Sequence, residues 1–235
     1  MDFMSQFELA DFWINLLKII WINVVLSGDN AVVIALAARS LPPRERKLAI
    51  VWGSGAAVLL RVILTIVAAQ LMAMPYLQLI GGALLLWIGV TLLVEEDGDD
   101  DEEKEYASLM AAIRTILIAD LVMSLDNVIG VATAAKGDMT LLILGLAISI
   151  PVVVFSSSLM ITVMTRFPIL VTLGAALIGW VAGEAAVNDA AIKPLVLGNP
   201  LFEYGVPALC AAAVVLLGHT LKNKAQQKKL DSPEE

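Results

Sequence analysis

Two copies of one polar tetrapeptide lie inside long apolar segments of this chain. They are Ser27-Gly28-Asp29-Asn30 and Ser124-Leu125-Asp126-Asn127, and the two aspartates are 97 residues apart. The same offset pairs identical or similar flanking residues: Val25 with Val122, Ala35 with Ala132, Ala37 with Ala134, Ala38 with Ala135, and Arg39 with Lys136. An ionisable side chain inside a membrane span is costly and by default marks a functional site. Equivalent aspartates in two copies therefore predict one site built from both halves.

The two motifs offer oxygen ligands to a cation. Carboxylate and amide oxygens suit the hard dications Mg²⁺, Ca²⁺ and Mn²⁺ better than copper or zinc, which favour nitrogen and sulfur. A third carboxylate, Asp120, stands six residues before Asp126. The candidate metal ligands are therefore Asp29, Asp126, Asp120, Asn30 and Asn127.

Small and polar residues around the motifs are expected to support this site. Asn23 corresponds to Asp120 at the offset of 97. Ser27 and Ser124 compete for backbone hydrogen bonds, and Gly28 loosens the turn. We therefore expect the first helix to unwind near Gly28 and to free backbone carbonyls toward a buried cavity. The alternative is that the two motif aspartates only cap the second half of a broken helix.

Arg61 and Glu184 are two further charged residues of the apolar segments that bear on this site. Arg61 needs a counter-charge there, and its charge together with those of Asp29, Asp120 and Asp126 sums to −2, which one dication would neutralise. Without metal, crowded carboxylates are expected to take up protons, which predicts exchange of metal for protons. In the alternative, Arg61 is only a structural counter-charge. Glu184, near the outer end of its segment, either lines an exit path or reaches the membrane interface.

The composition is typical of an integral membrane protein. The 235 residues are 59% hydrophobic and 16% charged, and the mean hydropathy is +0.86. We predict an all-α membrane protein with seven transmembrane helices, at about 12–38, 48–72, 76–94, 110–135, 139–164, 169–187 and 204–221. The single cysteine excludes an intramolecular disulfide. Because neither a nucleotide-binding loop nor a catalytic triad is present, we do not expect an enzyme.

The positions of the motifs predict two inverted three-helix repeats followed by a C-terminal helix. Three predicted spans separate the motifs, so the second copy is upside down relative to the first. An offset of 93 pairs residues of the third and sixth spans, among them Pro75 with Pro168, Gly81 with Gly174 and Trp87 with Trp180. The predicted divisions are 1–94 (first repeat), 95–106 (acidic cytosolic loop), 107–187 (second repeat), 188–203 (extracytoplasmic loop), 204–221 (seventh helix) and 222–235 (basic cytosolic tail).

Basic residues predict the orientation in the cell membrane. One set of loops carries the cluster at 39–47, Lys104, Arg166 and the basic tail, whereas the other carries little more than Lys136 and Lys193. We therefore expect a multi-pass protein with its N-terminus outside and its C-terminus in the cytosol. The acidic loop is interpreted either as a solvated linker or as a weak cytosolic cation sensor.

The paired motifs resemble the signature of the TerC family of integral membrane proteins, which is named for tellurium resistance. The resemblance rests on residues 26–30 and 124–127 and extends over about 10–221. The compact size is similar to that of the YjbE-type branch, within the lysine-exporter superfamily. The resemblance implies efflux of divalent metal, chiefly manganese, with Asp29 and Asp126 as essential acidic positions and Asp120 as an upstream acidic position. Asn23 departs from this pattern, since some members have an acid there.

The expected function is export of Mn²⁺ from the cytosol by alternating access between the repeats, with proton antiport as the expected coupling. No prosthetic group is expected. The expected partners are the transported dication and the lipid bilayer, without nucleic acid, and a homo-oligomer is compatible with the sequence. Two alternatives stay open: an accessory factor that supplies metal to exported proteins, and an exporter of small organic cations such as lysine.

Overall fold

The computed structural model describes residues 10–72, 74–94, 102–135, 138–196 and 198–231. Within these ranges the regular secondary structure is entirely helical. The helices are α1 (Ala10–Ala38), α2 (Pro43–Met72), α3 (Leu77–Val94), α4 (Glu102–Ala135), α5 (Met139–Arg166), α6 (Ile169–Asn188), α7 (Lys193–Val196) and α8 (Pro200–Asp231). The prediction of an all-α protein is confirmed.

Each of the seven predicted apolar segments forms a helix. In the part of the chain that the structure describes, five of these helices are long and apolar enough to cross a membrane. The five spans are Pro43–Val67, Leu77–Val94, Thr140–Arg166, Ile169–Asn188 and Pro200–Lys224. In α1, two shorter apolar stretches, Phe12–Ile22 and Gly28–Ala38, were found among the described residues. A multi-pass membrane protein is therefore confirmed, whereas seven crossings stay a prediction.

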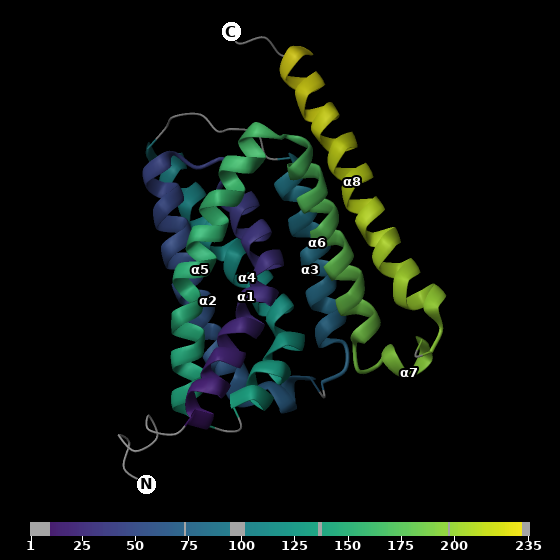
Figure 1. Ribbon diagram of the computed structural model, residues 1–235. Helices are drawn as coiled ribbons and strands as arrows, with labels where there is room; N and C mark the ends of the chain where they lie inside the picture. The colour runs from purple at the N-terminus through teal and green to yellow at the C-terminus, as the bar shows by residue number, and fades with distance from the viewer. Residues whose placement is uncertain (1–9, 73, 95–101, 136–137, 197, 232–235) are drawn as a thin grey trace.

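Two helices extend beyond their predicted bounds into charged sequence. α4 begins at Glu102, so the end of the predicted acidic loop is helical. α8 has 32 residues, which corresponds to about 48 Å, and it continues through the basic tail. Figure 1 shows its C-terminal part projecting beyond the upper end of the other helices.

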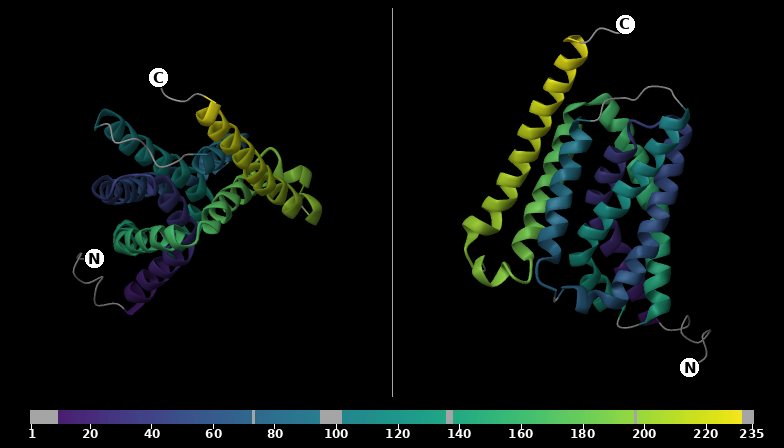
Figure 2. Two further views of the ribbon diagram at one scale, coloured as in Figure 1. Left: turned by 90° about the horizontal axis from the view of Figure 1, so that it is seen from above. Right: turned by 180° about the vertical axis from the view of Figure 1, so that it is seen from behind.

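The helices run up and down in one bundle. In Figure 1, α1 runs from the lower end to the upper end and α4 runs in the opposite direction. The α1–α2 and α5–α6 connections and the end of α8 share the upper end, whereas α7 lies at the lower end. The predicted basic side therefore corresponds to the upper end. Seen from above in Figure 2, α3, α6 and α8 group to one side of α1, α2, α4 and α5.

The contacts between helices keep the same pattern when α1, α2 and α3 are replaced by α4, α5 and α6, and the reverse. α1 packs along α5, as α4 packs along α2, and α3 packs along α6. α1 and α4 also contact each other, while α8 lies outside this scheme and covers α6 and α3. The largest apolar core, which includes Leu36, Leu85, Ile116 and Ile178, joins both sets of helices.

Close approach at glycines joins α3, α6 and α8. A Cβ atom at Gly82 would lie 2.6 Å from the carbonyl oxygen of Ala182. A Cβ atom at Gly183 would lie 2.4 Å from the Cα atom of Pro207. Small residues allow such backbone contacts between membrane helices, where dispersion contacts rather than apolar burial drive association. These three helices therefore form one tightly packed unit of the bundle.

The predicted unwinding near Gly28 is wrong for this structure. α1 is a continuous α-helix from Ala10 to Ala38, and α4 is continuous through the second motif. One glycine costs a helix only about 1 kcal/mol relative to alanine. Unpaired backbone groups in hydrocarbon cost several kcal/mol each, so a membrane favours the intact helix. The motif side chains, not freed carbonyls, must therefore supply any ligands in this conformation.

Candidate functional site

Arg61 on α2 joins Asp120 and Ser124 on α4 in a closed polar ring. The Nη2 atom of Arg61 donates to Oδ1 of Asp120 and forms a salt bridge with it. The Nε atom of Arg61 donates to Ser124 Oγ at 3.0 Å, and the Ser124 hydroxyl donates to Oδ2 of Asp120 at 3.1 Å. Both oxygens of Asp120 therefore have partners, and Ser124 both accepts and donates.

The packing of α2 along α4 places this ring. Asp120 and Ser124 are four residues apart, so they share one face of α4. One turn earlier, Ile116 fills the space beside Gly53, where a Cβ atom would lie 2.9 Å from the Ile116 side chain. This contact lets the two helices approach closely enough for the Arg61 side chain to reach both polar groups.

The ring is buried and its charges cancel. Arg61, Asp120 and Ser124 are 4%, 8% and 0% exposed. An isolated charge in such surroundings costs several kcal/mol, and a close partner of opposite sign with further hydrogen bonds offsets that cost. The counter-charge of Arg61 in this conformation is therefore Asp120, and a second-motif residue, Ser124, completes its hydrogen bonding.

The first motif presents one buried and one exposed side chain. Asn30 is 5% exposed, and its Oδ1 atom has no hydrogen-bond partner among the described residues. Asp29 and Gly28 are exposed. A buried polar atom without a partner calls for a specific explanation, such as an ion or water. An amide oxygen in this position has the chemistry of a hard-cation ligand.

Four candidate residues fall outside the described side chains. Asn23, Ser27, Asp126 and Asn127 lie on described helical backbone, but the positions of their side chains are not described. Among the side chains that are described, no three His, Cys, Asp or Glu residues gather closely enough to hold a metal ion. A site shared by Asp29 and Asp126 stays a prediction.

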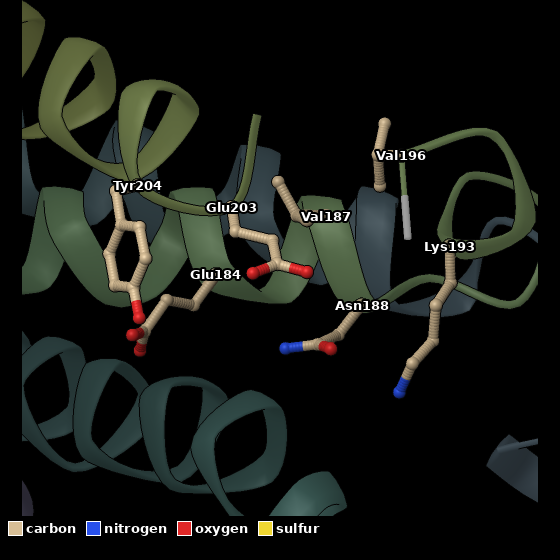
Figure 3. A pocket seen from close by; sticks show the side chains of 7 residues that line it. All are labelled: Glu184, Val187, Asn188, Lys193, Val196, Glu203 and Tyr204. Atoms are coloured by element: carbon tan, nitrogen blue, oxygen red, sulfur yellow. The ribbon is translucent and has the colours of Figure 1, made fainter. Parts of the chain in front are cut away.

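A second polar site lies where α6 ends and α8 begins. It is a pocket of ≈ 210 Å³ lined by Glu184, Val187, Asn188, Lys193, Val196, Glu203 and Tyr204. Figure 3 shows the Tyr204 hydroxyl and the Glu184 carboxylate pointing toward one another. Glu184 accepts a hydrogen bond from Trp180 Nε1 at 2.9 Å, and Glu203 accepts one from the Gly198 N–H at 3.3 Å. The pocket opens at the end of the bundle that the sequence assigns to the outside.

Sequence reasoning missed a buried carboxylate next to this pocket. Asp189 is 0% exposed. It accepts hydrogen bonds from four backbone N–H groups, at 2.9 to 3.2 Å: Tyr76, Gln78, Leu79 and Ala191. Burial alone would raise the pKa of this carboxyl, but the four N–H groups together lower the pKa below its ordinary value of 3.8.

Asp189 therefore caps the start of α3 from the end of α6. The only sequence signal is an acidic residue directly after an apolar helix. That signal predicts a local turn, which the Ala191 N–H provides, but it does not identify partners more than 100 residues earlier.

Comparison with known proteins places most of the chain in one group of membrane proteins. Residues 8–226 match the family model described as integral membrane protein TerC family. The chain is 42% identical to the uncharacterized membrane protein YjbE of Bacillus subtilis (strain 168), over 88% of this chain and 94% of that protein. It is 22% identical to the uncharacterized membrane protein YkoY of the same organism, over 86% and 68%.

A more distant match covers only part of a longer protein. The UPF0053 inner membrane protein YoaE of Escherichia coli (strain K12) is 28% identical over 68% of this chain, but the match spans 35% of the E. coli protein. No solved structure matches the chain.

Proposed function

This chain belongs to the TerC family of integral membrane proteins, and from that premise we propose that it exports a hard divalent cation, Mn²⁺, from the cytosol. The observation that carries the proposal is the doubled Asp-Asn motif, placed at equivalent positions of two helices that contact each other. Acidic residues inside membrane helices mark ion pathways.

The charges of the motif residues match one dication. With Asp120 neutralised by Arg61, Asp29 and Asp126 leave a charge of −2 for the cargo. Asn30, whose buried Oδ1 has no partner among the described residues, would add a neutral oxygen ligand, as would Asn127. Dications with several oxygen ligands are bound through such mixed carboxylate and amide sets.

The proposed transport step is alternating access between two inverted repeats. The helices α1–α3 have packing partners equivalent to those of α4–α6. The helices α1 and α4 run in opposite directions. Such repeats rock about a shared site near the membrane midplane. The proposed coupling on the return step is proton antiport.

The pocket at the end of α6 supplies an exit in this scheme. Glu184 and Glu203 line it from two helices, and their carboxylates attract a cation that leaves the central site. The pocket also holds Lys193, whose charge limits how tightly a cation is retained. Weak retention suits release rather than storage.

A flux assay with purified protein in liposomes tests the proposal. Vesicles that contain a Mn²⁺-sensitive dye should report Mn²⁺ entry, and an opposing pH gradient should accelerate this entry. Absence of flux by folded protein would contradict export and would favour an accessory role in metal supply. Inhibition by lysine but not by other dications would favour an organic-cation exporter.

A further inference from the structure

The Arg61–Asp120 pair distinguishes two corresponding helix contacts, that of α2 with α4 and that of α5 with α1. At the offset of 97, Asp120 corresponds to Asn23, which is uncharged. At offsets of 93 to 97, Arg61 corresponds to residues 154–158, none of which is charged. The acid and the base are therefore both present where α2 packs along α4, and both absent where the corresponding helices, α5 and α1, pack together.

Because the acid and the base occur together or not at all, the role of Asp120 is to pair with Arg61 rather than to bind the transported ion. If Asp120 were a ligand in a symmetric site, an acid would be expected at position 23 with or without a base nearby. A partner of Arg61 is needed only where Arg61 is present. The geometry agrees, because both carboxylate oxygens of Asp120 are already bound within the ring.

The position of the guanidinium adds a second reason. A dication bound directly by Asp120 would lie close to the buried charge of Arg61 and would be repelled by it in a medium of low dielectric constant. While Arg61 keeps its hydrogen bonds to Asp120 and Ser124, the Asp120 carboxylate is not free to bind a metal ion as well.

The ring also fixes the second motif. Ser124 is the first residue of that motif, and its hydroxyl is held from α2 and from the preceding turn of α4. These bonds determine how α4 is rotated about its axis relative to α2. Asp126 and Asn127 follow within one helical turn, so the same bonds determine the angular position of these two residues around the axis of α4.

From these observations, and resting on the proposed function, we propose that Arg61 is a resident counter-cation and that Asp120 is a positioning residue, not a ligand of the transported ion. The pair orients the second motif, and the cargo site draws its charge from Asp29 and Asp126 alone.

A cycle of neutralising substitutions tests this inference. The variants are Asp120→Asn, Arg61→Gln and the double variant, with Arg61→Lys as the conservative change. Each single neutralisation leaves a buried charge without its partner, so Tm should fall and Mn²⁺ flux should drop by about tenfold or more. The double variant carries two neutral amide side chains that can hydrogen-bond to each other, so both Tm and Mn²⁺ flux should recover.

The Michaelis constant separates positioning from ligation. In the double variant, we expect Mn²⁺ flux within about threefold of wild type with an unchanged KM, because the cargo ligands are intact. Arg61→Lys keeps the charge but loses the Nε bond to Ser124, so its flux should lie between wild type and Arg61→Gln. A double variant with restored Tm but a strongly raised KM, or no flux, would overturn the inference.

The Tm values keep this test separate from the proposed function. If wild type moved no Mn²⁺, the proposed function would fail, while recovery of Tm in the double variant would still support the resident ion pair. A double variant that is no more stable than the two single variants would overturn the pairing, whatever the wild type transports.

Discussion

Asp189 accepts a hydrogen bond at 2.9 Å from the backbone N–H of Tyr76, which lies 113 residues earlier in the chain. The same carboxylate accepts from Gln78 and Leu79 in the first turn of α3. A helix start is ordinarily capped by the residue just before it. Here the end of α6 caps the start of α3, so the two helices that correspond in the proposed repeats are joined at one end of the bundle.

Removal of this carboxylate should destabilise the protein strongly. Asp189→Ala removes the acceptor of one buried and three part-buried backbone N–H groups, and we expect a loss of about 3 kcal/mol or more. Asp138, which caps α5 through Thr140 and Leu141, provides the comparison. Asp138→Ala should cost only about 1 kcal/mol. Thermal unfolding in detergent measures both, and equal losses would contradict a special role for Asp189.

Acid should remove the contribution of Asp189. Its pKa in the folded protein lies below the ordinary value of 3.8. A lowered pKa means that the carboxylate stabilises the fold fully above the unfolded-state pKa and loses this effect as the pH falls through the folded-state pKa. The Tm difference between wild type and Asp189→Asn should thus be constant from neutral pH to about pH 5. Below pH 3.8 it should shrink, and a difference that grows there would contradict this assignment.

Tyr76 occupies a backbone conformation that favours glycine. Its φ is 67°, in the left-handed region, which costs a residue with a Cβ atom about 1 kcal/mol. The side chain is 55% exposed, so little packing is lost by removing it. Tyr76→Gly should leave Tm unchanged or raise it slightly. Tyr204→Gly, in the first turns of α8, should lower Tm because glycine weakens a helix.

The contact between α6 and α8 should not tolerate a side chain at Gly183. Gly183→Leu would force α8 away from α6, because a Cβ atom alone would come within 2.4 Å of Pro207 Cα. We expect a loss of several kcal/mol or failure to fold. Gly205 has nothing within 4 Å of its Cβ position, so Gly205→Leu should be tolerated. Comparable yields of folded protein from both variants would contradict the packing.

Much of the helical framework could be predicted from the sequence because hydrocarbon imposes simple rules. An apolar segment must form a helix of sufficient length, and prolines and charges limit it. The predicted segment from 169 to 187 differs from α6 by one residue. The charged start of α4 could not be predicted in this way, because outside hydrocarbon a helix is decided by local propensity and packing. The unwinding at Gly28 was wrong because the cost of unpaired backbone groups outweighs the weak preference of one glycine.

The candidate site was only partly predictable. The repeated motif identified the aspartates, and the burial of Arg61 required an acidic partner. The packing of α2 along α4 determines which acid lies beside Arg61. The same packing brings Ser124 into hydrogen-bonding distance of Arg61. Asp189 was missed because its partners lie on a helix that is distant in sequence. Such contacts are properties of the tertiary arrangement.

Mn²⁺ flux into proteoliposomes containing Asp29→Asn or Asp126→Asn tests the central claim most directly. Asp138→Asn is the matched control, because it is the same substitution and asparagine keeps a helix cap. Each motif variant alone should lose flux while it inserts and unfolds like wild type, since each removes half of the charge that balances the dication. Asp138→Asn should transport normally. Normal flux through both motif variants would contradict a cation site shared by the two halves of the chain.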